Sequence, residues 1–167
     1  MPISPEKEKP FVRHGWRLLA WSQITSQLEE LRRDVRRIAE TDPEGYRQHP
    51  RVKLFAAVRR LLLEIIPTDP NAPEFRLGNT LGAEHRHWRR AKFNGRFRLF
   101  FRFQSSTQTI IYVWMNDENT LRKSGGRTDP YSVFYQMLER GRPPSDWDGL
   151  LRESATLKDE SPSSEAP

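Results

Sequence analysis

The sequence predicts an α+β fold in which helices pack on one face of a small, mostly antiparallel β-sheet. Three observations support this class. Two segments with helical spacing of apolar residues come first, strand-like segments come next, and a further short helical pattern comes after them. Helices grouped ahead of an unbroken run of strands favour one helical layer packed against one sheet.

The first helix is predicted from residue 22 onward, where apolar residues recur in steps of four and three. The stripe consists of Ile24, Leu28, Leu31, Val35 and Ile38. Ser22 is the expected N-cap. The preceding residues 15–21, GWRLLAW, form either a short strand or the beginning of this helix.

A second helix is predicted from about Pro50 to Ile66, because apolar side chains again keep to one face. Its expected inward residues are Leu54, Val58, Leu61, Leu62 and Ile65. Pro67 and Pro70 should end it. The glycine-containing segment 71–84 is expected to be a loop.

Residues 87–103, HWRRAKFNGRFRLFFRF, predict a β-hairpin with one apolar and one cationic face. From Arg86 to Arg102 the chain carries seven Arg or Lys residues and no acid. Alternate side chains of a strand point to opposite faces. Phe97, Leu99, Phe101 and Phe103 therefore share one face, and Arg96, Arg98 and Arg102 share the other.

The register of this hairpin depends on its turn. A two-residue Asn94-Gly95 turn would mix charge into both faces. A three-residue or bulged loop instead pairs Phe93 with Phe97 and Lys92 with Arg98. Because a slip of one residue turns a strand over, burial should select the second register.

The remaining elements are a buried strand and a last helix. Residues 109–115, TIIYVWM, are apolar on both faces and predict a central strand. Asp129-Pro130 should begin a helix from Tyr131 to Arg140, with Tyr131, Phe134 and Leu138 facing inward. The sheet face left uncovered by helices is expected to be the cationic one.

Composition limits the class of protein. A chain of 167 residues favours one domain, expected at residues 14–153 between a flexible leader (1–13) and a disordered tail (154–167). A net charge of +6 and a pI near 10.0 favour an anionic partner such as nucleic acid. The absence of cysteine excludes disulfides and thiolate metal sites and suits a cytoplasmic location. No apolar run approaches the roughly 18 residues of a membrane span.

For the cationic face, binding without catalysis is the simpler interpretation, since such a face can be solvated or can bind an acidic protein. His85 and His87 form an H-x-H pair that could bind a metal if both lie on one strand face. Glu84 is the only carboxylate beside them, and Arg86 and the arginines after it would repel a cation, so no metal site is expected.

The catalytic interpretation is RNA cleavage without a metal. The 2′-hydroxyl of RNA can attack the adjacent phosphate if a protein orients it, accepts its proton, stabilises the added charge and protonates the leaving oxygen. Arg and Lys can stabilise that charge. Arg98 and Arg102 would hold the phosphate beside Arg90 and Lys92.

Two long stretches of the chain resemble YhaV-type toxins, a branch of the RelE superfamily. They are RRAKFNGRFRLFFRF and WMNDENTLRKSGGRTDPYSVFYQMLERGRPPSDW. The likeness runs from His14 to Glu153 and includes DPEGYRQHP and APEFRLGNTLG. It implies a RelE-like fold with the active site on the sheet face away from the helices.

The resemblance also implies a function and partners. The expected activity is a cofactor-independent endoribonuclease that cuts mRNA, on the ribosome, and so inhibits translation and growth. The expected partner is an antitoxin with an AbrB/SpoVT-type DNA-binding fold, and the pair would bind operator DNA and repress its own operon.

Residue by residue, the family pattern falls on the cationic hairpin and on the segment from Asn116 to Tyr131. The implied catalytic residues are Arg90, Lys92, Arg98, Asp117, Glu118, Arg122 and Tyr131, with the general base left open among Lys92, Asp117 and Glu118. The expected RNA-binding residues are Arg86, Arg89, Arg96, Arg102, Asn116 and Lys123. Two alternatives stay open: a non-catalytic nucleic-acid-binding module or co-repressor, and a degenerate toxin that binds its antitoxin without cutting.

Overall fold

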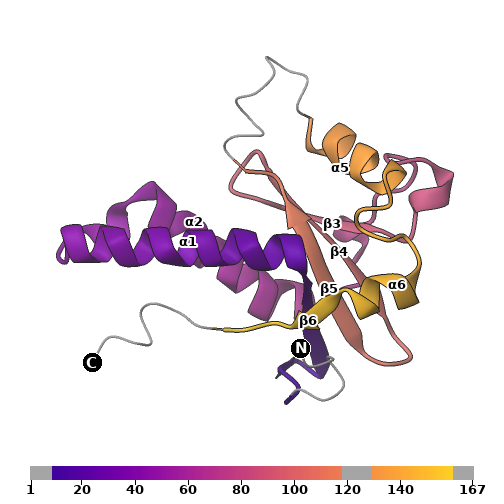
Figure 1. Ribbon diagram of the computed structural model, residues 1–167, viewed down its shortest axis with the longest axis horizontal. Helices are drawn as coiled ribbons and strands as arrows, with labels where there is room; N and C mark the ends of the chain where they lie inside the picture. The colour runs from indigo at the N-terminus through magenta and orange to yellow at the C-terminus, as the bar shows by residue number, and fades with distance from the viewer. Residues whose placement is uncertain (1–8, 118–128, 160–167) are drawn as a thin grey trace.

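The computed structural model describes residues 9–117 and 129–159, and these form a mixed six-stranded sheet with helices on both sides (Figure 1). The strands are β1 (Val12–Arg13), β2 (Trp16–Trp21), β3 (Arg89–Phe93), β4 (Phe97–Gln104), β5 (Thr109–Met115) and β6 (Ser154–Thr156). The helices are α1 (Ser22–Thr41), α2 (Pro50–Arg60), the π-helical η2 (Leu61–Ile65), α3 (Ile66–Thr68), α5 (Pro130–Glu139) and α6 (Trp147–Arg152). Short 3₁₀ turns are η1 (Tyr46–Gln48), η3 (Pro73–Phe75) and η4 (Ala83–His85). The predicted α+β class is confirmed.

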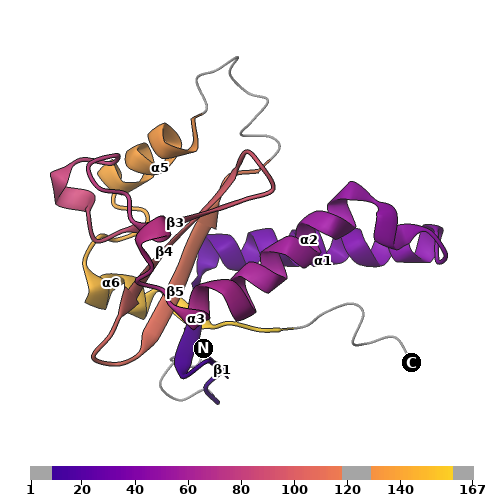
Figure 2. The ribbon, with the colours of Figure 1, turned by 180° about the vertical axis from the view of Figure 1, so that it is seen from behind.

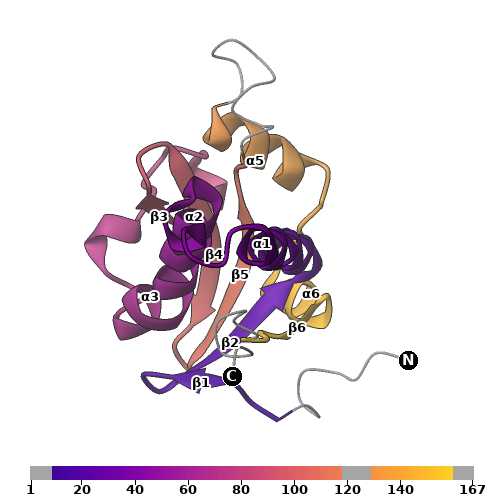
Figure 3. The same cartoon turned by 90° about the vertical axis from the view of Figure 1, so that its left-hand side faces the viewer.

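The sheet has the strand order β1-β2-β5-β4-β3, with β6 also pairing with β2. Only the β2–β5 pair is parallel, so the sheet is mostly antiparallel as expected. All residues of β5 are buried, which confirms the predicted central strand. Figure 3 shows α1 and α2 in front of the sheet, with β5 behind them.

Two apolar cores lie on the two faces of this sheet. On one face Leu99, Phe101 and Tyr112 pack with Leu31 of α1 and Val58 of α2. A buried hydrogen bond joins these layers, because the Tyr112 hydroxyl donates to the Leu62 carbonyl at 2.6 Å. Complete burial raises the pKa of Tyr112 well above its usual value, so the hydroxyl stays protonated.

The second face is not bare, contrary to the expectation from the sequence. Phe100 and Trp114 pack there with Phe134 of α5 and Leu150 of α6. Seen from behind, in Figure 2, α5 and α6 lie across the sheet from the α1–α2 pair. The cationic side chains therefore share their face with two short helices and contact residues of both.

Local details differ from the predictions for identifiable reasons. Residues 16–21 are strand, and Trp21, with extended backbone, precedes the helix, so Ser22 is the first helical residue and not its N-cap. The π-helical turn η2 inserts one extra residue into the second helix. The inward position therefore moves from Ile65, which is 41% exposed, to Ile66, which is fully buried.

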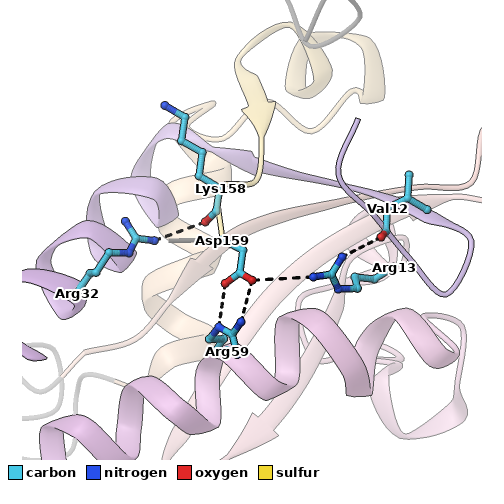
Figure 4. Close-up of polar contacts among 6 residues, drawn as sticks. All are labelled: Val12, Arg13, Arg32, Arg59, Lys158 and Asp159. Carbon is cyan, nitrogen blue, oxygen red and sulfur yellow. Dashed lines mark hydrogen bonds and ion pairs between the residues drawn. The ribbon is translucent and has the colours of Figure 1, made fainter. Parts of the chain in front are cut away.

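The fold continues past the predicted boundary at Glu153. Ser154–Thr156 pair with β2, and Leu157 is buried in the core below α1 and α2. Asp159 then accepts two hydrogen bonds of 2.8 Å from Arg59 and lies 3.9 Å from Arg13 (Figure 4). Residues 154–159 are therefore ordered, contrary to the prediction, because backbone pairing and this ion pair hold them. The rest of the predicted tail, 160–167, and residues 1–8 of the predicted leader lie outside the described part of the chain.

None of the described helices is long and apolar enough to span a membrane.

Tyr112→Phe tests the bond between the sheet and the second helix. The change leaves the buried Leu62 carbonyl without its donor, so we expect the free energy of unfolding to fall by about 1–2 kcal/mol in urea denaturation. Tyr46→Phe is the matched control, since the Tyr46 hydroxyl makes no hydrogen bond within the described residues. An equal loss in both variants would show that the Tyr112 bond contributes nothing specific.

Candidate active site

The β3–β4 hairpin places four cationic side chains, Arg90, Lys92, Arg98 and Arg102, on one face of the sheet. Phe93 pairs with Phe97 and Lys92 pairs with Arg98, which confirms the predicted register. The three-residue loop 94–96 allows this register because Asn94 (φ 44°) and Gly95 (φ 75°) adopt left-handed backbone conformations. Asn and Gly tolerate this conformation better than other residues, so the loop sequence fits its geometry.

The hydroxyl of Tyr131 joins two of these cations. Arg90 donates to it at 2.9 Å and Arg98 donates to it at 3.2 Å. Tyr131 lies in the first turn of α5, where Asp129 caps the helix by accepting from the Tyr131 N–H at 3.0 Å. Its ring packs edge-on against Phe100, with 5.9 Å between ring centres. Helix capping and aromatic packing therefore fix the phenol over the hairpin.

Backbone carbonyls, not carboxylates, hold both guanidinium groups. Arg98 donates to the carbonyls of Gly95 at 2.7 Å and Phe97 at 2.9 Å. Arg90 donates to those of Glu74 at 3.2 Å and Arg76 at 3.4 Å. Within residues 9–117 and 129–159 neither arginine forms an ion pair, so their positive charge remains available to an external anion.

Asn116 holds the hairpin turn from inside the protein. Its Oδ1 accepts from the Arg98 N–H at 2.6 Å, and its Nδ2 donates to the Arg96 carbonyl at 3.1 Å. The residue is 0% exposed, so its side chain has no surface to offer RNA and the expected binding role does not fit. Its role is to position Arg98. The sequence does contain a sign of this role: Asn116 is a polar amide directly after an apolar strand, and a buried amide needs hydrogen-bond partners.

Arg102 does not join the cluster around Tyr131. Phe100 lies between Arg98 and Arg102 along β4, and its ring stacks on Phe134 at 4.2 Å. The Arg102 guanidinium lies 5.5 Å from the ring centres of Trp88 and Trp147. Burial lowers the pKa of Arg102 to about 10, so it remains cationic at neutral pH. The expected second phosphate ligand is thus partly enclosed.

The other predicted residues are dispersed. Arg86 and Arg96 are exposed, and Arg89 turns its guanidinium toward the Phe103 ring at 5.4 Å. Asp117 lines a pocket of about 170 Å³ with residues of α1 and α2. Glu118, Arg122 and Lys123 lie outside the described residues. The site that the structure assembles therefore consists of Arg90, Lys92, Arg98 and Tyr131.

The H-x-H pair is not on a strand. His85 ends the η4 turn and is buried, whereas His87 is exposed. Partial desolvation, followed by the neighbouring Arg102, lowers the pKa of His87 to about 4. The expectation that both project from one strand face is wrong, because His85 lies in a 3₁₀ turn and His87 in the turn that follows it.

Fold and site together define a small α+β domain with a cationic cluster built around a tyrosine. A family profile described as "toxin with endonuclease activity, of toxin-antitoxin system" matches residues 18–155. The chain is 43% identical over 143 residues to Ribonuclease toxin YhaV of Escherichia coli K12, covering 84% of this chain and 93% of that relative. Toxin YhaV of Escherichia coli O157:H7 matches to the same extent. The chain belongs to the YhaV family of toxins, and no solved structure matches it.

Asn116→Ala tests the positioning role of the buried amide. The change leaves the Arg98 N–H and the Arg96 carbonyl unsatisfied, so we expect the free energy of unfolding to fall by about 2–4 kcal/mol in urea titration. Asn79→Ala is the control, because that exposed side chain has no hydrogen bond in the described structure. A change below about 0.5 kcal/mol for Asn116→Ala, as expected of the control, would contradict the role.

Proposed function

We propose that this chain is an endoribonuclease that cleaves mRNA without a catalytic metal. The observation that carries the proposal is the convergence of Arg90 and Arg98 on the Tyr131 hydroxyl, with no ion pair to either arginine from an acid of the described residues. The family description supports endonuclease activity, and the name of the K12 relative supports RNA as the substrate.

The cationic cluster would bind the phosphate to be cleaved. The Arg98 Nε and Nη1 groups bond Tyr131, Gly95 and Phe97, so its Nη2 would donate to the phosphate, and Arg90 and Lys92 add charge on the same face. As the 2′-oxygen bonds to phosphorus, negative charge grows on the non-bridging oxygens. Fixed donors aimed at that charge lower the barrier because they need no reorganisation during the reaction.

Proton transfer completes the step. The 2′-hydroxyl loses its proton to a base as the 2′-O–P bond forms, and the P–O5′ bond breaks as the 5′-oxygen gains a proton. The products are a 2′,3′-cyclic phosphate and a 5′-hydroxyl. The Tyr131 oxygen already accepts two N–H groups, which leaves its own O–H free to donate to a phosphate or leaving oxygen. Lys92, Asp117 and Glu118 are the candidate bases.

The resemblance to RelE-type toxins extends this proposal to partners. The substrate would be mRNA on the ribosome in the cytoplasm, and its cleavage would stop translation and growth. An AbrB/SpoVT-type antitoxin would neutralise the toxin and, with it, bind operator DNA and repress their operon. Membership of a toxin family of toxin–antitoxin systems supports the existence of an antitoxin partner.

Cleavage of a defined mRNA in the presence of EDTA tests the proposal, with wild type, Arg98→Ala and Arg98→Lys compared with and without ribosomes. Loss of a charge-stabilising contact costs about 2–4 kcal/mol in the transition state, so Arg98→Ala should cut more slowly by about 100-fold or more. Arg98→Lys should also be impaired, because a point charge replaces a planar fork. Arg33→Ala, an exposed arginine of α1 with no contact to the cluster, should cut like wild type.

A wild-type rate in folded Arg98→Ala would remove Arg98 from the mechanism. If no protein cuts, and RNA or DNA binding weakens with salt alike in wild type and Arg98→Lys, the chain is a binding module or co-repressor. A folded wild type that binds its antitoxin but neither cuts nor binds nucleic acid would be a degenerate toxin.

A further inference from the structure

Three potential metal ligands meet where the η4 turn approaches the last residue of α5. One ligand atom from each of Glu84, His85 and Glu139 lies within 4.8 Å of the other two. In the part of the chain that the structure describes, this is the only such group of three. It lies outside the Arg90–Arg98–Tyr131 cluster, and the sequence interpretation did not foresee it because Glu139 is 54 residues from His85.

His85 is the residue that distinguishes this group from an ordinary acidic patch. It is only 8% exposed, and its ring makes no hydrogen bond to any described residue. Its Nδ1 is buried without a partner, and its Nε2 lies 3.9 Å from a Glu84 carboxylate oxygen, too far for a hydrogen bond. Buried imidazoles are normally hydrogen-bonded or ligated, and Nε2, the nitrogen shown beside the Glu84 carboxylate, makes no hydrogen bond to a described residue, so an ion there could supply its partner.

Tyr135 lies beside two of the three ligands and packs against the imidazole. Its ring packs edge-on against the His85 imidazole, with 5.9 Å between ring centres and 82° between planes. Interaction with the neighbouring Glu139 carboxylate raises the pKa of Tyr135, which places the phenol beside a second ligand. Groups that fix a ligand from outside the coordination shell are a regular feature of metal sites.

We propose that Glu84, His85 and Glu139 bind one divalent first-row transition ion, with Zn²⁺ as the best match to one imidazole nitrogen and two carboxylate oxygens. The two carboxylates balance the charge of the ion, with water as a fourth ligand. Ligand atoms around tetrahedral Zn²⁺ lie about 3.4 Å apart. The Glu84 side chain, 65% exposed, is free to close this difference.

Such an ion would join η4 to the C-terminal end of α5. Tyr131 begins the same helix, eight residues and roughly 12 Å along its axis from Glu139. The ion would therefore hold α5 in place over the sheet while taking no part in phosphate chemistry. This inference does not depend on the proposed ribonuclease activity, because its readouts are binding and thermal stability.

Isothermal titration of Zn²⁺ into the full, chelator-treated chain tests the site. We expect one saturable equivalent per chain and a rise in Tm, with affinity about 10-fold weaker or worse in Glu84→Gln and Glu139→Gln. Both glutamates are exposed, so these variants should fold, which circular dichroism can confirm. Glu44→Gln, an exposed acid elsewhere, and His87→Asn should bind like wild type.

Three results would overturn the proposal. One is the absence of saturable binding to the wild type. Another is unchanged binding in both Glu84→Gln and Glu139→Gln. The third is loss of binding in His87→Asn, which would assign the ion to the H-x-H pair instead.

Discussion

The register of the β3–β4 hairpin is the constraint on which the site depends. Burial of Phe97, Leu99 and Phe101 against the helical core fixes which face of β4 points inward. Since side chains alternate along a strand, this burial also fixes the side on which Arg98 projects. Asn116 then closes the turn by bonding the backbone on both sides of Phe97. The apolar core and the cationic site are thus two results of one pairing.

Much of this arrangement is local in sequence and could be predicted. Alternation of period two identified the hairpin faces, and steps of three and four identified α1 and α2. The site was predicted in part, because Arg90, Lys92 and Arg98 are fixed by strand alternation alone. Tyr131 could be placed on the inward stripe of its helix, but its contact with Arg98 spans 33 residues and depends on how α5 crosses the sheet.

The features that could not be predicted depend on packing between distant segments. The π-helical turn at Leu61–Ile65 moves the buried position from Ile65 to Ile66, and the spacing of apolar residues in the sequence does not predict this turn. The polar sequence of β6 suggested disorder, yet β2 offers it an unpaired strand edge and Arg59 offers Asp159 a bidentate partner. Arg102 matched the alternation as well as Arg98 did, but the aromatic rings beside it enclose its charge.

The arginines on the helical side of the domain and those on the hairpin have different hydrogen-bond partners. On the helical side the described arginines Arg37, Arg51 and Arg59 bond carboxylates, so their charge is locally compensated. On the hairpin, the hydrogen bonds that Arg90 and Arg98 donate to described residues go to carbonyl and phenol oxygens. Dipoles of this kind orient a guanidinium but cannot neutralise it. Two like charges held at one hydroxyl repel each other, and the phosphate that we propose as their ligand would offset that repulsion.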